Sequence, residues 1–164
     1  MAVSPQPLRP LANEQAVAFW KKKVPMSPRE FNQLDDKSKA LGFSVGGIAK
    51  GDELATVMDA MGRAASEGMT LHEFKKQCGD IFTRRGWTGE KAWRIDNLFR
   101  TNLQTQYSAG RWAQMQATAE RRPYGQYSAV NDSRTREAHA AMHGRVFPLD
   151  SPVWDEWWPT NGFR

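Results

Sequence analysis

Cysteine is nearly absent from this chain, and so are long apolar runs. Cys78 is the single cysteine among 164 residues, which excludes an internal disulfide and is typical of a reducing compartment. No stretch approaches the roughly 20 apolar residues that a membrane-spanning helix needs, and the amino terminus lacks the apolar core of a signal peptide. We therefore expect a protein with no membrane partner that stays in the compartment where it is made.

The composition is typical of a folded chain. Charged residues make up 25% of it and aromatic residues 11%, with seven tryptophans. At this length we expect one domain, in which residues 11–123 form a helical body and residues 124–164 form a C-terminal cap. Residues 1–10 hold three prolines and no apolar period, so they are predicted to form an extended arm.

Capping residues and apolar periodicity predict the helices of the body. Ser27 to Glu30 and Thr70 to Glu73 are both capping boxes, and Gly68 and Pro123 mark helix ends. Gly110 either bends the longest helix or marks a close helix crossing. The predicted helices cover residues 11–24, 27–42, 52–68, 70–82 and 88–122. Cys78 lies on the inner stripe of the helix at residues 70–82, so its thiol is expected to be buried.

The cap is predicted to mix strands with a helix. Residues 124–130 are the first stretch with a strand pattern, and residues 145–149 are the second, and we expect the two to pair as a small two-stranded element. Between them, the alanines and the closing Gly144 favour a helix over residues 131–144. The expected fold class is therefore mainly α, a helical body with a small α+β C-terminal cap.

The helix predicted at residues 131–144 gathers the unusual polar side chains. Helical spacing places them along one stripe, which consists of Asp132, Arg136, His139 and His143. Two histidines four residues apart have the spacing of a zinc-binding pair, but the sequence offers no third nitrogen ligand beside them.

Two other interpretations of this stripe stay open. His139 and a carboxylate on one face meet the minimum requirement for acid–base catalysis, although no nucleophile accompanies them. We favour a structural hub, in which Asp132 caps the helix, pairs with Arg136 or holds Arg134, and so orients His139 under the aromatic tail. Trp154, Trp157 and Trp158 in that tail are expected to cover a core.

Basic residues are concentrated in one segment. Residues 81–122 contain eight Arg or Lys residues and three acidic ones, an excess that equals the net charge of +5 of the whole chain. A solvated helix face explains this excess, and contact with DNA phosphates is the alternative. The candidate nucleic-acid contacts are Arg84, Arg85, Arg94, Arg121 and Arg122.

Several of these pieces together resemble the phage Mu F-like minor head protein family, also called the phage head morphogenesis family. The resemblance runs through residues 127–139 to Gly144, then through 146–150, Trp154 and 158–163. Upstream it includes Arg100-Thr101-Asn102 and Tyr107-Ser108-Ala109-Gly110-Arg111-Trp112. Two features depart from the family pattern, because Thr160 replaces the second proline of Pro-Pro-Asn-Gly and the sequence reaches Arg164 without the Cys-x-Cys pair. We expect a truncated family C-terminus, which would lack half of any metal site shared with His139.

The resemblance implies a structural role without enzymatic activity or a cofactor. It implies a minor head protein of the prohead and virion, made in the host cytoplasm, that acts in head morphogenesis near the portal. The partners it implies are portal or capsid proteins, and double-stranded DNA is a further candidate. Within such a protein, the residues expected to organise the long helix and the polar hub are Arg100, Asn102, Tyr107, Arg111, Asp132, Arg134, His139, Gly144 and Trp154. The alternatives are a DNA-binding protein packaged or ejected with phage DNA, and a hydrolase or nuclease centred on Asp132 and His139.

Overall fold

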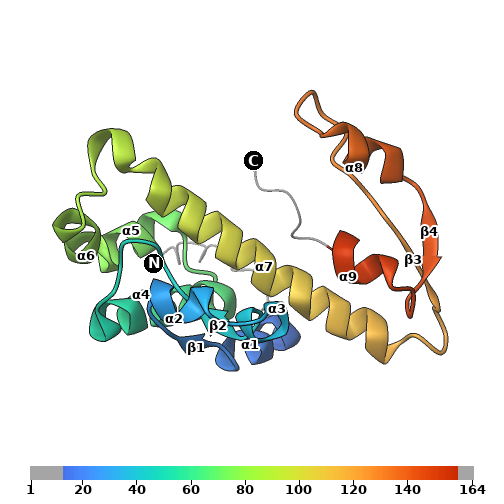
Figure 1. The fold of residues 1–164 in the computed structure, drawn as a ribbon, viewed down its shortest axis with the longest axis horizontal. Helices are drawn as coiled ribbons and strands as arrows, with labels where there is room; N and C mark the ends of the chain where they lie inside the picture. The colour runs from blue at the N-terminus through green and yellow to red at the C-terminus, as the bar shows by residue number, and fades with distance from the viewer. Residues whose placement is uncertain (1–12, 159–164) are drawn as a thin grey trace, which may run out of the picture. The chain divides into compact units, whose positions relative to one another are not determined.

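The structure is a computed structural model that describes residues 13–158, apart from the side chains of residues 36 and 37. The chain divides into two compact units at Gly110, and the helix α7 (Trp93–Ala117) crosses that division (Figure 1). The predicted arm at residues 1–10 and the family residues 159–163 lie outside the described residues. Within the described part, no helix is both long enough and apolar enough to cross a membrane.

Helices dominate both units, as the sequence predicts. The N-terminal unit contains α1 (Glu14–Lys21), β1 (Val24–Pro25), α2 (Pro28–Asn32), α3 (Asp36–Lys39), β2 (Gly42–Phe43), α4 (Gly51–Glu67), α5 (Leu71–Gln77), α6 (Gly79–Arg84), the 3-10 helix η1 (Gly89–Lys91) and most of α7. The C-terminal unit contains the end of α7, β3 (Tyr124–Gln126), α8 (Glu137–Met142), β4 (Val146–Pro148) and α9 (Val153–Trp157). The mainly α fold class is confirmed.

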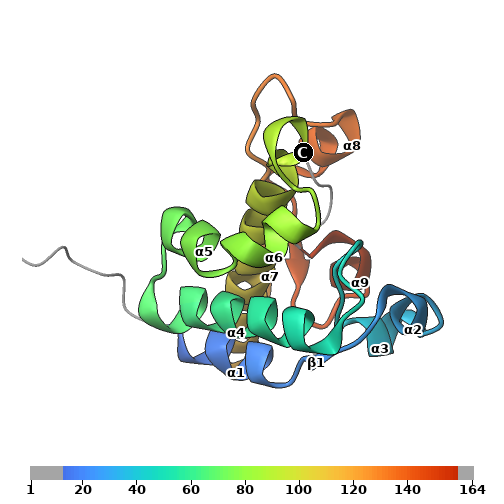
Figure 2. The same cartoon turned by 90° about the vertical axis from the view of Figure 1, so that its left-hand side faces the viewer.

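The core of the N-terminal unit forms around α4, which α1 flanks (Figure 2). Leu54, Val57 and Met61 project from α4 at helical spacing and are almost fully buried. Phe74 lies at the centre of an aromatic group, 5.1 Å from Phe99 and 5.6 Å from Phe82 between ring centroids. The predicted terminator Gly68 ends α4 with a φ of 69°, a left-handed conformation that glycine adopts without strain.

Both predicted capping boxes are confirmed, but the helix predicted at residues 27–42 is wrong. Ser27 and Thr70 each accept a hydrogen bond from the backbone three residues later, and the glutamate there bonds back to the cap. The first helix then stops at Asn32, and Asp35 accepts a hydrogen bond from the backbone N–H of Ser38 at the start of α3. The cap formed by the Asp35 side chain therefore competes with continuation of the helix, and it divides residues 27–42 into α2 and α3.

Two more predicted helices are interrupted or shorter than expected. The helix through Cys78 divides there, because Cys78 has φ −101° and ψ 9° and links α5 to α6. Its thiol is fully buried as predicted, and burial raises its pKa to about 11. The helix expected at residues 88–122 consists of η1, a short link and α7, followed by turns after Ala117.

Gly110 marks a close helix crossing, which is one of the two predicted alternatives. A Cβ at this position would lie 2.6 Å from the backbone N of Ala16 in α1. The α-helix continues through Gly110. A side chain larger than hydrogen therefore cannot fit here without a shift of one helix.

A small parallel sheet in the N-terminal unit was not predicted. Val24 pairs with Gly42, and Pro25 pairs with Phe43. Lys23 supports this pairing, because its ammonium donates to the carbonyls of Ala40 and Gly42 at 3.0 and 3.1 Å. Two-residue strands have too little periodicity to be recognised from sequence.

Candidate functional site

The two strands of the C-terminal unit pair as predicted and hold the segment that carries the family residues. Tyr124 pairs with Pro148 and Gln126 with Val146 in an antiparallel ribbon, which is shorter than the predicted strands (Figure 1). Beyond the ribbon, the N–H of Gly144 donates to the carbonyl of Tyr127 at 2.8 Å. Gly144 has a φ of 80°, so the chain reverses there in a conformation that favours glycine.

The helix predicted at residues 131–144 is wrong in its first half. Only Glu137–Met142 is helical, and Asn131 adopts a φ of 55°. Asp132 closes a turn instead, because its carboxylate accepts hydrogen bonds from the backbone of Arg134 and from the hydroxyl of Thr135, both at 3.1 Å. These local bonds offer the backbone an alternative to helix, so the predicted polar stripe does not form.

His139 makes its hydrogen bond with a residue that the sequence analysis gave no role. Its Nδ1 lies 2.7 Å from the hydroxyl of Tyr127, and its ring meets that of Trp157 edge to face at 5.4 Å. Burial raises the pKa of Tyr127 above its usual value, so the phenol stays protonated near neutral pH. A neutral His139 accepts this proton in a hydrogen bond, and an imidazolium would donate to the phenol oxygen instead.

His143 follows α8 and bonds to a different part of the chain. The backbone N–H of Ala129 donates to its Nδ1 at 3.1 Å. Both histidines therefore use Nδ1 in protein hydrogen bonds, and across residues 13–158 no three His, Cys, Asp or Glu side chains form a group that could hold a metal ion. Zinc sites need three or four protein donors, so the described residues alone do not fit a metal.

The tryptophans of the tail pack together around the ribbon. Trp154 is 5% exposed and donates from its indole N–H to the carbonyl of Pro148 at 2.7 Å. Trp112, from the end of α7, lies 6.2 Å from Trp154 and 4.5 Å from Trp158 between ring centroids. Edge-to-face and tilted aromatic pairs of this kind stabilise a small core beyond the area that they bury.

The family residues on α7 belong to different units. Arg100 is exposed and Tyr107 is half-buried in the N-terminal unit, whereas Arg111 is exposed in the C-terminal unit. Asn102 donates to the carbonyl of Leu98 in its own helix at 2.9 Å. That these residues organise α7 against the cap stays a prediction.

Three of the five candidate DNA contacts bind the protein itself. Arg85 and Arg84 both pair with Glu53, a carboxylate that is 6% exposed at the start of α4. The hydrogen bond from Arg85 holds the pKa of Glu53 below its ordinary value. Arg94 donates to the carbonyl of Gly46 at 3.0 Å, and its guanidinium lies 4.9 Å from the Trp87 ring centroid. Arg121 and Arg122 are exposed in the turns after α7.

The outer face of the β3–β4 ribbon carries apolar side chains that the described residues of the unit leave exposed. Tyr124 is 63% exposed and Val146 is 56% exposed, and Pro148 beside Tyr124 is exposed as well. Phe147 points to the opposite face, where its ring meets Trp154 edge to face. The strand alternation thus divides the ribbon into a packed face and a solvent-facing apolar one.

Comparison with known proteins assigns the chain to a family. A model of the family described as Phage Mu protein F like protein matches residues 55–164, well over half of the chain. The chain belongs to this family. It is 34% identical, over 94% of its length, to the protein F of Escherichia phage Mu that is named for capsid assembly. It is 32% identical, over 80% of its length, to the Mu-like prophage FluMu F protein of Haemophilus influenzae.

These relatives are much longer than the Mu F-like chain described here. The chain spans 39% of the phage Mu protein and 34% of the Haemophilus protein. No solved structure matches the chain. The family match begins within α4 and includes the whole C-terminal unit, so it covers the ribbon, α8 and the tryptophan cluster.

Sequence reasoning missed three contacts of this Mu F-like chain. Tyr127 is the hydrogen-bond partner of His139, Glu53 is the partner of two arginines, and Trp112 completes the tryptophan cluster. Tyr127 belongs to the family run, which could have drawn attention to it. No local sequence pattern predicts that Glu53 pairs with Arg84 and Arg85, which follow it by 31 and 32 positions.

Proposed function

We propose that this chain is part of a structural protein that acts in phage head assembly, close to the portal. The observation that carries the proposal is the similarity, over nearly the whole chain, to a protein of phage Mu that is named for capsid assembly. The proposed partners are the portal and capsid proteins of the same phage. The proposed locations are the host cytoplasm during assembly and the head of the finished virion.

The outer face of the β3–β4 ribbon is the surface that we assign to a head partner. Tyr124, Val146 and Pro148 expose apolar area side by side, and exposed apolar area on a folded protein is typical of an interface. In the described residues the ribbon has only two strands, so each also presents an unpaired edge. A partner protein that covers this face would remove both features from water.

Assembly in cells tests this proposal. The chain, in the length in which its phage encodes it, is co-expressed with the portal and major capsid proteins, and purified heads are analysed by mass spectrometry. We expect it in the heads, cross-linked to the portal protein. Val146→Lys should lower its incorporation at least about tenfold, because a lysine interrupts an apolar contact at the centre of an interface. Gln104→Lys, on an exposed position of α7, is the matched control. Heads without the chain would refute the assembly role, and cross-links to capsid protein alone would refute the portal position.

DNA binding is a second candidate that the exposed arginines of the C-terminal unit support. Arg111, Arg121 and Arg122 are exposed in that unit, and the arginines paired with Glu53 contribute less to this candidate. Binding to duplex DNA should weaken steeply as salt rises, and replacing Arg121 and Arg122 with alanine should lower the log–log slope by about two. Binding that is absent, or insensitive to salt, would remove this candidate.

A hydrolase or nuclease has no comparable support. Its proposed centre required Asp132 and His139 on one helical stripe, whereas Asp132 lies in a turn and His139 bonds to Tyr127. A relative in the same family is named for capsid assembly, and we therefore propose a non-enzymatic role for this chain.

A further inference from the structure

Backbone hydrogen bonds inside the β3–β4 ribbon use every second residue of each strand. The N–H of Leu149 donates to the carbonyl of Pro123 at 2.8 Å, and the N–H of Tyr127 donates to the carbonyl of Arg145 at 2.9 Å. Bonded and non-bonded pairs alternate in an antiparallel ribbon, so the pair midway between these two is also bonded, and the pairs on either side of it are not. The residues of those two non-bonded pairs direct their backbone N–H and C=O groups away from the ribbon.

On the side of β4, this outward-facing edge consists of Val146 and Pro148. Pro148 has no backbone N–H, and its carbonyl already accepts hydrogen bonds from the backbone of Ser151 at 3.1 Å and from the indole of Trp154 at 2.7 Å. Proline on an outer strand is one way in which folded proteins prevent a further strand from pairing. The edge of β4 therefore offers a new strand only the backbone groups of Val146.

On the side of β3, the outward-facing edge consists of Tyr124 and Gln126, and we call it the β3 edge. The backbone N–H and C=O groups of these two residues make no hydrogen bond with another described residue. The side chain of Gln126 does not cap them, because its amide donates to the carbonyl of Gly144 at 3.0 Å. Both residues are exposed, whereas Gly125 between them is buried. Two donors and two acceptors are thus left without a protein partner among residues 13–158.

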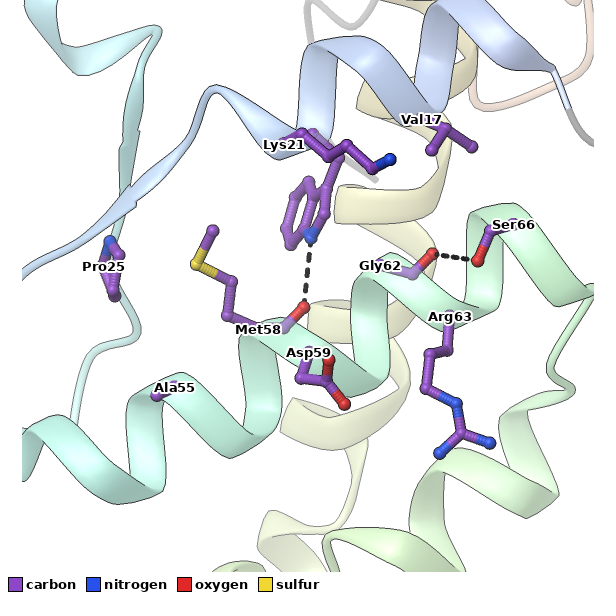
Figure 3. A pocket seen from close by; sticks show the side chains of 10 residues that line it. Val17, Lys21, Pro25, Ala55, Met58, Asp59, Gly62, Arg63 and Ser66 are labelled. Atoms are coloured by element: carbon purple, nitrogen blue, oxygen red, sulfur yellow. Dashed lines mark hydrogen bonds between the residues drawn. The ribbon is translucent and has the colours of Figure 1, made fainter.

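A groove of about 550 Å³ between α1 and α4 also exposes apolar side chains, but its backbone is already bonded (Figure 3). The carbonyl of Met58 accepts from the indole N–H of Trp20 at 3.0 Å, and the carbonyl of Gly62 accepts from the hydroxyl of Ser66 at 3.1 Å (Figure 3). The charged side chains that line this groove have both signs and are Lys21, Asp59 and Arg63. The groove therefore specifies no single partner chemistry, whereas the β3 edge specifies an extended backbone.

We propose that the β3 edge binds an extended segment of a phage head protein, which adds to the ribbon as a third strand. This binding mode rests on the head-assembly function proposed above. An extended backbone presents donors and acceptors at the spacing of Tyr124 and Gln126, so it pairs with all four of their backbone groups.

The outer face of the ribbon determines which side chains this segment carries. Successive side chains of a strand point to opposite faces of a sheet, so every second side chain of the added strand lies beside Tyr124. Tyr124 is 63% exposed, and with Val146 and Pro148 it forms the apolar outer face. Apolar side chains at alternate positions of the segment would extend this face over three strands and remove part of it from water.

Two substitutions at Gln126 test the proposal during head assembly. The chain, in the length in which its phage encodes it, is co-expressed with the portal and major capsid proteins, and its amount in purified heads is measured by mass spectrometry. Gln126→Pro removes one outward N–H and keeps the bonds inside the ribbon, so its incorporation should fall at least about tenfold. Gln126→Ala is the matched control, because it loses the same side-chain bond but keeps the N–H, and its incorporation should equal that of the parent chain.

Failure of the third strand and failure of the assembly role give different results. Heads that contain the parent chain and Gln126→Pro in equal amounts would overturn the third strand and leave the assembly role intact. Heads that lack the parent chain would overturn both. Circular dichroism of Gln126→Pro shows whether this variant folds like the parent chain.

Hydrogen exchange of single amides tests the same contact in the unsubstituted chain, whether or not Gln126→Pro folds. In the isolated chain the amides of Tyr124, Gln126 and Val146 should exchange rapidly, because none of them is bonded across the ribbon. In heads, the amides of Tyr124 and Gln126 should slow at least about tenfold more than that of Val146, since only they gain hydrogen bonds.

Two exchange results would contradict the third strand. Equal slowing at Tyr124, Gln126 and Val146 in heads would overturn it, because that result indicates a partner that covers the outer face alone. Slow exchange at Tyr124 and Gln126 in the concentrated isolated chain, lost on dilution, would also overturn it and assign the β3 edge to a second copy.

Discussion

The two units of this chain are stabilised in different ways. In the N-terminal unit seventeen buried residues form one apolar cluster around α4, α5 and α7. In the described part of the C-terminal unit only Tyr127, Met142 and Trp154 are buried in the corresponding cluster, and half-buried rings surround them. The larger unit depends on hydrophobic burial, and the smaller one depends more on aromatic contacts and hydrogen bonds.

This difference determines which kind of substitution destabilises each unit most. A side chain removed from the large cluster leaves a cavity that close packing cannot fill. In the small unit, the hydrogen bond between Tyr127 and His139 involves one of the three residues that are buried in its cluster. We therefore expect the largest losses of stability from substitutions in the large cluster, and smaller, local losses from substitutions in the small unit.

The largest effect is expected for Phe74→Ala in the N-terminal unit. Phe74 is fully buried between Phe82 and Phe99, so its loss should lower the free energy of unfolding by about 3–5 kcal/mol. Urea denaturation followed by circular dichroism measures this change. Tyr124→Ala removes an aromatic ring of similar size that is 63% exposed, and it should change stability by less than about 0.5 kcal/mol. Equal effects of the two substitutions would contradict the packing seen here.

Gly110→Ala should have the next largest effect. Its Cβ would lie 2.6 Å from the backbone N of Ala16 and 2.7 Å from Oδ1 of Asn13, and such overpacking costs about 1–3 kcal/mol. Gly79→Ala is the matched control, because a Cβ there meets nothing within 4 Å. Thermal melts of both variants separate the two outcomes. If both glycines tolerate alanine, the crossing of α1 and α7 is looser than described.

Tyr127→Phe should lower the free energy of unfolding by a smaller amount, and this loss of stability should be confined to the C-terminal unit. The substitution removes the hydroxyl that bonds to His139 and keeps the buried ring, so we expect a loss of about 0.5–1.5 kcal/mol. Hydrogen exchange of the amides in β3, α8 and β4 reports it locally. Tyr124→Phe changes an exposed hydroxyl and should leave these exchange rates as they are. Faster exchange in α4 as well would show that the two units unfold together.

The smallest expected effect is a change in the acid dependence of stability. The hydrogen bond from Arg85 lowers the pKa of Glu53 below its ordinary value of 4.5, so the folded state favours the carboxylate. The contribution of the ionised Glu53 to the free energy of unfolding is complete above pH 4.5, and it is lost as the pH falls through the lowered pKa. Glu53→Gln cannot titrate, so its unfolding free energy should fall less steeply than that of the parent chain below pH 4.5. Parallel curves in the two titrations would show that Arg85 does not act on Glu53.

Local signals in the sequence identified several features correctly. The capping boxes at Ser27 and Thr70, the terminator Gly68 and the buried Cys78 follow from residues within one or two helical turns. The pairing of the two C-terminal strands was also predicted, from two strand-like stretches on either side of one helix. The helix at residues 131–144 was wrong because the turn bonds of Asp132 compete with the alanine-rich helical pattern.

The sequence by itself determined the helical class, the helix caps and the family, because each of these depends on short-range spacing or on a linear motif. The tertiary structure decided that Arg84 and Arg85 bind Glu53, that His139 bonds to Tyr127, and that α1 crosses α7 at Gly110. These contacts join residues from 12 to nearly 100 positions apart. Only the packing of helices and strands against one another brings such residues within bonding distance, so no local pattern in the chain specifies them.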